Sequence, residues 1–144
     1  MTHEDRGHYA AKHPPDRILN PRIAEAVRGR ASQSEISCAA AHAIATDLMV
    51  APAEVGATID VLEMRIVKCQ LGLYGYRPQK KIVTPAETPT EDLERAIRQA
   101  LSNERLSCSS AWEIAAGFGI PRMEVSSVCD ALGIKIKPCQ LGSF

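Results

Sequence analysis

The feature that most constrains the fold is an internal repeat, because the second half of the chain restates the first at a constant offset. Residues 37–72 align with residues 107–142 without a gap, so every matched pair lies 70 positions apart. A fixed register over this length indicates two copies of one folding unit. In a chain of 144 residues these units are small, and each has a thin core. The best preserved pairs are Ser37/Ser107, Cys38/Cys108, Cys69/Cys139, Gln70/Gln140, Leu71/Leu141 and Gly72/Gly142.

Composition limits the class of protein that this chain can be. Lysine and arginine number 17, and so do aspartate and glutamate, whereas strong nucleic-acid binders are usually basic. We find no apolar run long enough to cross a membrane and no signal-segment pattern in the first residues. The 5 cysteines suit a reducing compartment better than a disulfide scaffold, because their number is odd. We therefore expect a cytoplasmic protein with no membrane partner.

The repeat and the local turn signals divide the chain into four parts. Residues 1–17 have no counterpart in the second copy and contain paired prolines, so we expect an arm or tail there. The two repeated units are expected over residues 18–74 and 88–144. Between them, residues 75–87 are basic and interrupted by proline, which predicts a linker or a wing strand continuing through residues 81–84.

Each unit is predicted to run as helix, short strand, second helix, tight turn, third helix and second strand. Capping residues and prolines mark the helix starts, and alternating apolar and basic residues mark the strands. In the first unit these elements begin at Asn20, Glu35, Ser37, Pro52 and Met64. In the second they begin at Thr88, which opens a capping box, and then at Arg105, Ser107, Pro121 and Ile134. The expected fold class is mainly α with small β-sheets (α+β).

This order of elements, together with the turn between the second and third helices, resembles a winged helix. Ala115 is small where the two helices cross, Gly119 suits a turn with positive φ, and Ile120 and Val125 are apolar between the helices. The first copy matches less closely, because Met49 replaces the turn glycine. The resemblance implies two tandem winged-helix-like modules, each with its two strands in one small sheet, and it implies DNA binding.

The third helix of such a module would enter the major groove of DNA. Here both copies carry carboxylates on that helix, at Glu54/Glu124 and Asp60/Asp130, and they lack most of the residue types that contact bases. Positive charge lies instead on the strands and the linker, which favours contact with the phosphate backbone or, alternatively, marks a solvated sheet face. The candidate nucleic-acid-binding residues are Arg65, Lys68, Arg77, Lys80, Lys81, Arg122, Lys135 and Lys137.

The repeated cysteines are the candidate metal or redox residues. Cys38 and Cys69 each follow a predicted strand of the same sheet, as do Cys108 and Cys139, so the members of each pair are expected to lie near one another. Four thiolates have the count for zinc or an iron–sulfur centre, but the local C-x-x-C spacing is absent. Buried, inert cysteine is favoured over metal binding and over a redox-responsive pair. We therefore predict no cofactor, with zinc or an iron–sulfur centre as the alternative.

Motifs of enzymes are not found in the sequence, which contains no phosphate-binding loop, no nucleophile elbow and no metalloprotease motif. The leading hypothesis is a non-enzymatic tandem winged-helix protein, transcription-regulator-like or otherwise nucleic-acid-associated, with double-stranded DNA as its partner. The alternative is a winged-helix pair without DNA binding that acts as a protein–protein interaction adaptor, with a protein partner or as a homodimer. A metal or redox sensor is the third hypothesis. The Cys-Gln-Leu-Gly sequence that closes each copy has no catalytic interpretation.

Overall fold

The computed structural model describes residues 19–78 and 80–144. The predicted arm over residues 1–17 therefore lies outside the described residues. Among those that are described, the chain is mainly helical with two small sheets, which confirms the expected fold class. No described helix has the length and apolar character that crossing a membrane requires.

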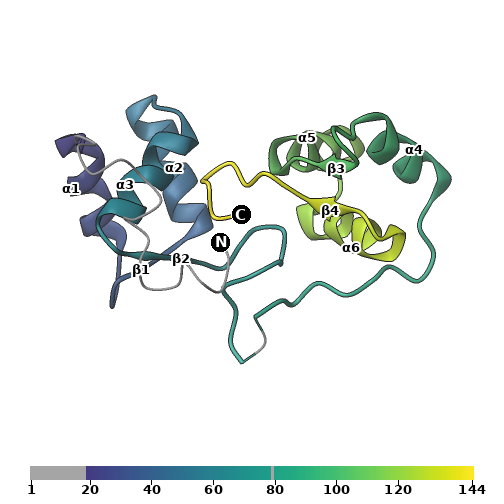
Figure 1. Ribbon diagram of the computed structural model, residues 1–144, viewed down its shortest axis with the longest axis horizontal. Coiled ribbons are helices and arrows are strands. Elements are labelled where there is room, and N and C mark those ends of the chain that lie inside the picture. Colours follow the sequence, from purple (N-terminus) through teal and green to yellow (C-terminus); the bar gives the residue numbers. More distant parts are fainter. Residues whose placement is uncertain (1–18, 79) are drawn as a thin grey trace. The chain divides into compact units, whose positions relative to one another are not determined.

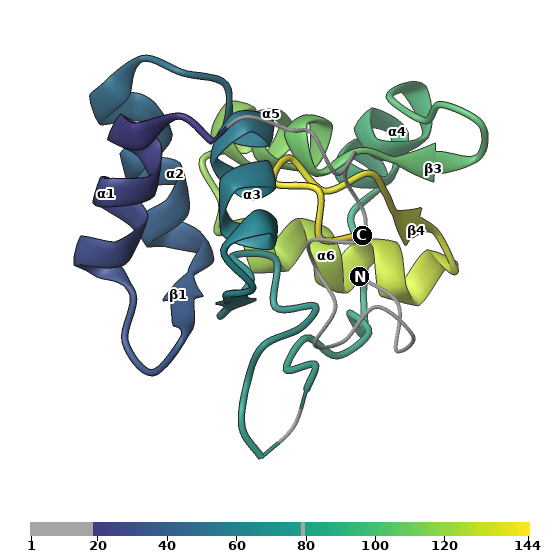
Figure 2. The same cartoon turned by 60° about the vertical axis from the view of Figure 1, so that its left-hand side comes forward.

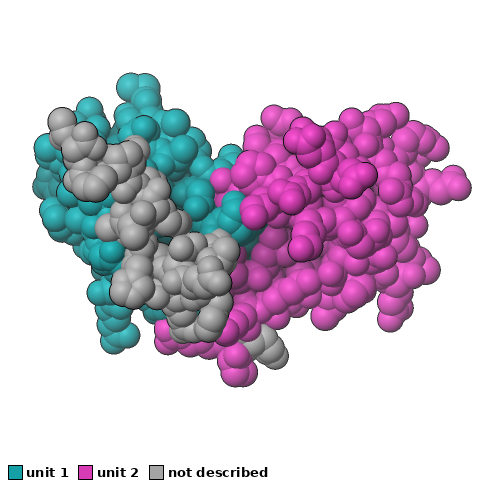
Figure 3. All heavy atoms as spheres, in the orientation of Figure 1, with its two compact units in different colours: residues 1–69, 140–144 teal, residues 70–139 magenta. Residues whose placement is uncertain are grey.

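The chain divides into two compact units, which Figure 3 shows in two colours. Unit 2 is residues 70–139, and unit 1 combines the preceding residues with residues 140–144. The boundaries between these compact units fall directly after Cys69 and Cys139. The segment that follows the last strand of each repeat belongs to the unit built mostly from the other repeat.

Unit 1 contains α1 (Pro21–Arg30), β1 (Glu35–Ser37), α2 (Cys38–Leu48), α3 (Pro52–Val61) and β2 (Arg65–Val67). The two strands pair in parallel. Parallel pairing needs a crossover of a dozen or more residues, which α2 and α3 supply. In Figures 1 and 2 the strands lie side by side at one end of the helices.

Unit 2 repeats this arrangement with α4 (Glu91–Gln99), β3 (Arg105–Leu106), α5 (Cys108–Phe118), α6 (Arg122–Leu132) and β4 (Lys135–Ile136). Its strands are again parallel neighbours, with crossover helices α5 and α6 between them. The predicted order of elements, and the predicted sheet of one strand before the second helix and one after the third, are both confirmed.

Side-chain caps fix where the helices begin. Asn20 accepts a hydrogen bond at 3.0 Å from a backbone N–H in the first turn of α1. Ser37 and Ser107 accept from the N–H three residues further on, at 3.1 and 3.0 Å. The predicted capping box at Thr88 is wrong, because the cap of α4 is Thr90, which accepts from a backbone N–H at 3.4 Å. Thr90 lies 70 positions after Asn20, so the repeat itself marks the cap.

The turn between the second and third helices has the same geometry in both units. Met49 and Gly119 are left-handed, with φ of 54° and 66°. In each turn the next residue donates its N–H, at 3.0 Å, to the carbonyl of the alanine where the helices cross. Met49 is 91% exposed, so its side chain meets no steric obstacle beyond the backbone strain of a left-handed residue.

The core of each unit is formed by equivalent residues of its helices and strands. These residues are buried on the inner faces of the elements, where burial of each large side chain stabilises the fold by about 1.5–3 kcal/mol. In unit 1 they are Ile23, Val27, Ile36, Ala41, Ala45, Val55, Ile59 and Ile66. In unit 2 they are Leu93, Ile97, Leu106, Ala111, Ala115, Val125, Cys129 and Ile136.

Candidate functional site

The segment that follows each last strand lies against the third helix of the unit that receives it. In unit 2 we call residues 70–78 and 80–86 the first strap, which contacts α6 through Gln70, Leu71, Lys81, Thr84 and Ala86. In unit 1 we call residues 140–144 the second strap, which lies against α3. The predicted strand through residues 81–84 is wrong, since that part of the first strap forms no strand.

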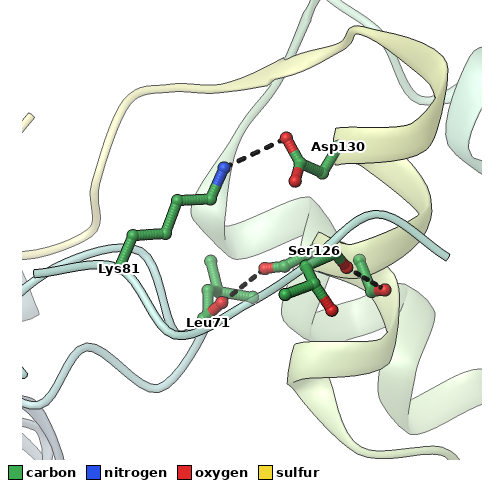
Figure 4. Close-up of polar contacts among 6 residues, drawn as sticks. Leu71, Lys81, Ser126 and Asp130 are labelled. Atoms are coloured by element: carbon green, nitrogen blue, oxygen red, sulfur yellow. Dashed lines mark hydrogen bonds and ion pairs between the residues drawn. The ribbon is translucent and has the colours of Figure 1, made fainter. Parts of the chain in front are cut away.

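The first strap is fixed to α6 where the Gln-Leu-Gly sequence begins. Ser126, which is buried, donates its hydroxyl to the Leu71 carbonyl at 2.5 Å (Figure 4). Arg122 donates a hydrogen bond to the side chain of Gln70 and stacks over the Trp112 ring, with its guanidinium carbon 3.6 Å from the ring centroid. Leu71 itself is 0% exposed. The strap is therefore anchored by one buried side chain and two polar contacts.

Glycine is required at the next position of this strap. Gly72 has φ of +73°, and a Cβ built there would lie 3.3 Å from atoms of Ile82, Val83 and Met123. Its carbonyl accepts from the N–H groups of Ile82 and Val83 at 3.0 and 3.2 Å. A left-handed residue packed this closely favours glycine, which gives the repeated Gly of the closing sequence a structural role.

Further contacts hold the rest of the first strap on the same helix. Lys81 pairs with Asp130 at 3.0 Å, as Figure 4 shows. Ser127 donates its hydroxyl to the Thr84 carbonyl at 2.6 Å, and its own carbonyl accepts from the Ala86 N–H at 3.0 Å. Three successive turns of contact thus cover the face of α6 that bears Ser126, Ser127 and Asp130.

The second strap meets α3 at the position equivalent to Ser126. That position is Gly56, 70 residues earlier, and a Cβ there would lie 1.8 Å from the Leu141 carbonyl oxygen. The backbone of the strap therefore occupies the space that any side chain at Gly56 would need. Leu141 is 1% exposed and Ser143 is 6% exposed. Leu71 and Leu141 are thus both buried, and Gly72 and Gly142 both have positive φ, which gives the repeated Leu-Gly a structural role.

The straps limit which faces of the third helices, α3 and α6, are accessible to a ligand. Residues 55–60 of α3 are all buried, and the equivalent face of α6 lies under the first strap. A helix that reads base edges must present that outward face to the groove. With the straps in place, residues 55–60 of α3 and the Ser126 side of α6 are not accessible to base edges, whereas Glu54 and Glu124 remain exposed.

Three of the candidate nucleic-acid-binding residues are engaged within the fold. Arg65 is half-buried and lies 3.9 Å from Glu35 across the β1–β2 sheet. Lys81 pairs with Asp130, and Arg122 is held between Trp112 and the first strap. The other candidates are exposed, and they are Lys68, Arg77, Lys80, Lys135 and Lys137.

Unit 2 gathers three exposed cations on one face of its sheet, which we call the basic face. Arg105 and Lys135 are partners in the parallel register, so their side chains leave the sheet on the same side. Lys137 continues the alternation two residues later, and its N–H donates to the carbonyl of Leu106 at 2.7 Å. The intervening Ile136 points into the core. The sheet therefore presents its cations to solvent and its apolar residues to the helices.

Arg105 was missed by reasoning from the sequence, although a signal was present. The strand containing Arg105 and the strand containing Lys135 were both expected, and both were expected in one sheet. Writing the two strands in parallel register would have placed these cations side by side.

Unit 1 lacks this basic face. Its equivalent positions, 70 residues earlier, are Glu35, Arg65 and Val67. Glu35 and Arg65 are partners in the register and carry opposite charges at 3.9 Å. The net charge of the three positions is thus zero in unit 1, whereas it is +3 for Arg105, Lys135 and Lys137 in unit 2.

The repeated cysteines lie beside the sheets, as expected. Cys108 donates its backbone N–H to the Pro138 carbonyl at 3.0 Å, next to Cys139. Cys38 follows Ser37, whose partner in the sheet is two residues before Cys69. Within the described part of the chain, no three His, Cys, Asp or Glu side chains gather where they could hold a metal ion.

Cys129 differs from these four, because it lies in the core of unit 2 where unit 1 has Ile59. Burial disfavours its thiolate and raises the pKa of Cys129 from 9.0 to about 11. At neutral pH it is a buried thiol, which agrees with a packing role.

Comparison of the chain with protein-family models, with curated proteins and with solved structures finds no match.

Proposed function

We propose that the protein is a non-enzymatic, nucleic-acid-associated protein that holds the phosphate backbone of double-stranded DNA on the basic face of unit 2. The observation that carries this proposal is the alignment of Arg105, Lys135 and Lys137 on one exposed side of a two-stranded sheet. Backbone contact by cations positions a protein on the duplex without reading its sequence. A transcription-regulator-like role would then need a further element or partner to supply specificity.

The covered third helices support backbone contact over groove reading. Because the first strap occupies the face of α6 that bears Ser126, Ser127 and Asp130, contact of DNA through the sheet leaves the strap in place. The acidic residues of those helices, among them Glu54 and Glu124, are exposed and would repel phosphate. The duplex is therefore expected on the sheet side of unit 2.

The test is binding of a fluorescent duplex of about 30 base pairs, followed by anisotropy at several salt concentrations. Three phosphate contacts predict that the logarithm of the binding constant falls against the logarithm of salt concentration with a slope of about −2.7. Changing Lys135 and Lys137 to Ala, or Arg105 to Ala, is expected to reduce that slope by about 1 for each cation removed.

Arg28→Ala is the matched control, because Arg28 is an exposed cation on α1 of unit 1. It is expected to leave the slope unchanged. If folded wild-type protein at about 100 µM does not shift the anisotropy at about 20 mM salt, backbone binding is ruled out.

A protein–protein interaction adaptor is the second candidate, and the straps favour it. In each strap a buried leucine lies at the contact with a third helix: the Leu71 carbonyl accepts from Ser126 of α6, and the Leu141 carbonyl lies against Gly56 of α3. This function predicts that a labelled peptide with the sequence of residues 139–144 binds the Leu141→Asp variant, whose own strap is weakened. Competition by the unlabelled peptide, but not by one with Asp at the leucine position, is the expected result. Failure of the peptide to bind the folded variant would exclude such docking on α3.

A further inference from the structure

The second strap reaches unit 1 by leaving the repeat to which it belongs in sequence. Residues of the first repeat complete unit 2, and residues of the second repeat complete unit 1. Exchange of one identical element between two similar bodies is the geometry by which protomers form domain-swapped dimers. Within a single chain, the contact between the second strap and α3 links the two repeats. The same contact can link two copies of the chain.

The contact on α3 does not depend on which copy of the chain supplies the strap. On α3 the bare backbone of Gly56 lies under the Leu141 carbonyl, and Leu141 and Ser143 of the strap are buried. A strap from a second copy brings the same atoms. We infer that two copies of this chain associate by exchanging residues 140–144, so that the second strap of each copy docks on α3 of the other.

The space above Gly56 on α3 determines which segment can dock there. Gly56 leaves room for a backbone carbonyl and for no side chain, so the docking segment approaches with its main chain against the helix. The first strap does not compete for this site, because its Leu71 is buried and its carbonyl is held by Ser126 in unit 2. Residues 140–144 of another copy are thus the segment that matches.

Docking of the second strap on α3 of its own chain, which we call closure, competes with docking on α3 of another copy. The strap of the same chain has an effective concentration of about the millimolar order, as expected for a short connection. Exchange therefore appears in wild-type protein only when its concentration approaches that value, and it becomes dominant when closure within the chain is blocked.

Two full-length variants isolate the exchange. Gly56→Ala cannot accept a strap but can donate one, because its Leu141 is intact. Leu141→Asp cannot donate a strap but can accept one, because its Gly56 is intact. Each variant alone is expected to be monomeric by native mass spectrometry. Their mixture at about 200 µM is expected to give a one-to-one dimer in which the strap of the Gly56→Ala chain docks on α3 of the Leu141→Asp chain, which is one half of the reciprocal exchange.

If both variants show the circular dichroism of the wild type and their mixture stays monomeric, the inference is overturned. Should either variant fail to fold, wild-type protein labelled with ¹⁴N or ¹⁵N is unfolded, mixed and refolded together at about 500 µM. A mixed-isotope dimer is then expected, and monomer alone overturns the inference. Exchange does not rest on DNA binding: the Lys135→Ala, Lys137→Ala variant is expected to exchange straps like the wild type, so the two proposals fail separately.

Discussion

The two units have equivalent core residues, but they differ in charge on the solvent side of their sheets. Ile36 and Ile66 of unit 1 have the equivalents Leu106 and Ile136 in unit 2, and all four are buried. On the opposite side, a neutral set of residues in unit 1 corresponds to the basic face of unit 2. Packing residues have been kept in both copies because each unit needs them to fold. Surface charge has not been kept, so the difference between the copies is the best guide to a function carried by one of them.

The straps offer a second comparison between the units. In unit 2 the strap carbonyl at Leu71 accepts from Ser126, whereas in unit 1 the carbonyl at Leu141 lies against Gly56. A serine hydroxyl thus contacts the strap backbone in unit 2, whereas a glycine leaves room for the strap backbone in unit 1.

The largest effect is expected from shortening the strap leucines. Leu71→Ala and Leu141→Ala should each lower the free energy of unfolding by about 4 kcal/mol, because each removes a fully buried side chain. Urea unfolding measures both values. Met49→Ala, at a position that is 91% exposed, is the control and should change stability by less than about 0.5 kcal/mol. If one variant loses this much free energy of unfolding and the other loses none, the two straps are not equivalent in stabilising their units.

A smaller effect separates the two ways of holding a strap. Gly56→Ala should destabilise the protein by about 3 kcal/mol, because the new Cβ meets the Leu141 carbonyl. Ser126→Ala should cost only about 1 kcal/mol, the value of one hydrogen bond. Gly117→Ala is the control, since a Cβ on that helical glycine meets nothing within 4 Å, and it should stabilise by about 0.5–1 kcal/mol. Equal losses at Gly56 and Ser126 would contradict the proposed difference.

Alkaline pH should weaken unit 2 through Cys129. Its pKa is raised from 9.0 to about 11 by burial, so the folded state keeps the proton that the unfolded state releases. Stability is therefore complete below pH 9 and falls by about 2 kcal/mol as the pH rises through this window. Urea titrations at intervals from pH 8 to about 11 measure the slope. Cys129→Ala should flatten it, and an equally steep slope in that variant would show that other groups cause the loss.

The smallest effect concerns the turn between the second and third helices. Met49→Gly should stabilise unit 1 by about 1 kcal/mol, because a left-handed backbone is strained for methionine and not for glycine. Gly119→Met should cost unit 2 a similar amount. Thermal unfolding of both variants provides the comparison, and changes of the same sign would show that the turns differ despite their similar φ values.

The helix starts and the turn between the second and third helices could be predicted from the sequence. Ser37, Ser107 and Pro52 carry start signals that act within one helical turn, and the turn glycine at Gly119 fixes its own conformation. For that reason the order of elements and the fold class could be predicted. The start of α4 was harder to locate, because Thr88 and Thr90, two residues apart, offer similar capping signals, and only the 70-residue offset from Asn20 separates them.

The candidate site could be predicted only in part. Lys135 and Lys137 were identified because alternation along one strand is visible in the sequence, but Arg105 joins them through a pairing between strands. The straps could not be foreseen, since nothing local distinguishes a Leu71 that packs in its own repeat from one that packs in the other. Such contacts depend on the path of the chain after the strand ends, which is decided by packing and not by propensity.

Exchanging the sheet residues between units shows most clearly whether the basic face binds DNA. Glu35→Arg with Val67→Lys gives unit 1 the cations of unit 2, and Arg105→Glu with Lys137→Val gives unit 2 the residues of unit 1. The measurement is the salt dependence of duplex binding by anisotropy. We predict a slope of about −2.7 for the wild type, a steeper slope for the first variant and a slope near zero for the second. The same slope in all three proteins would contradict the assignment of backbone binding to Arg105, Lys135 and Lys137.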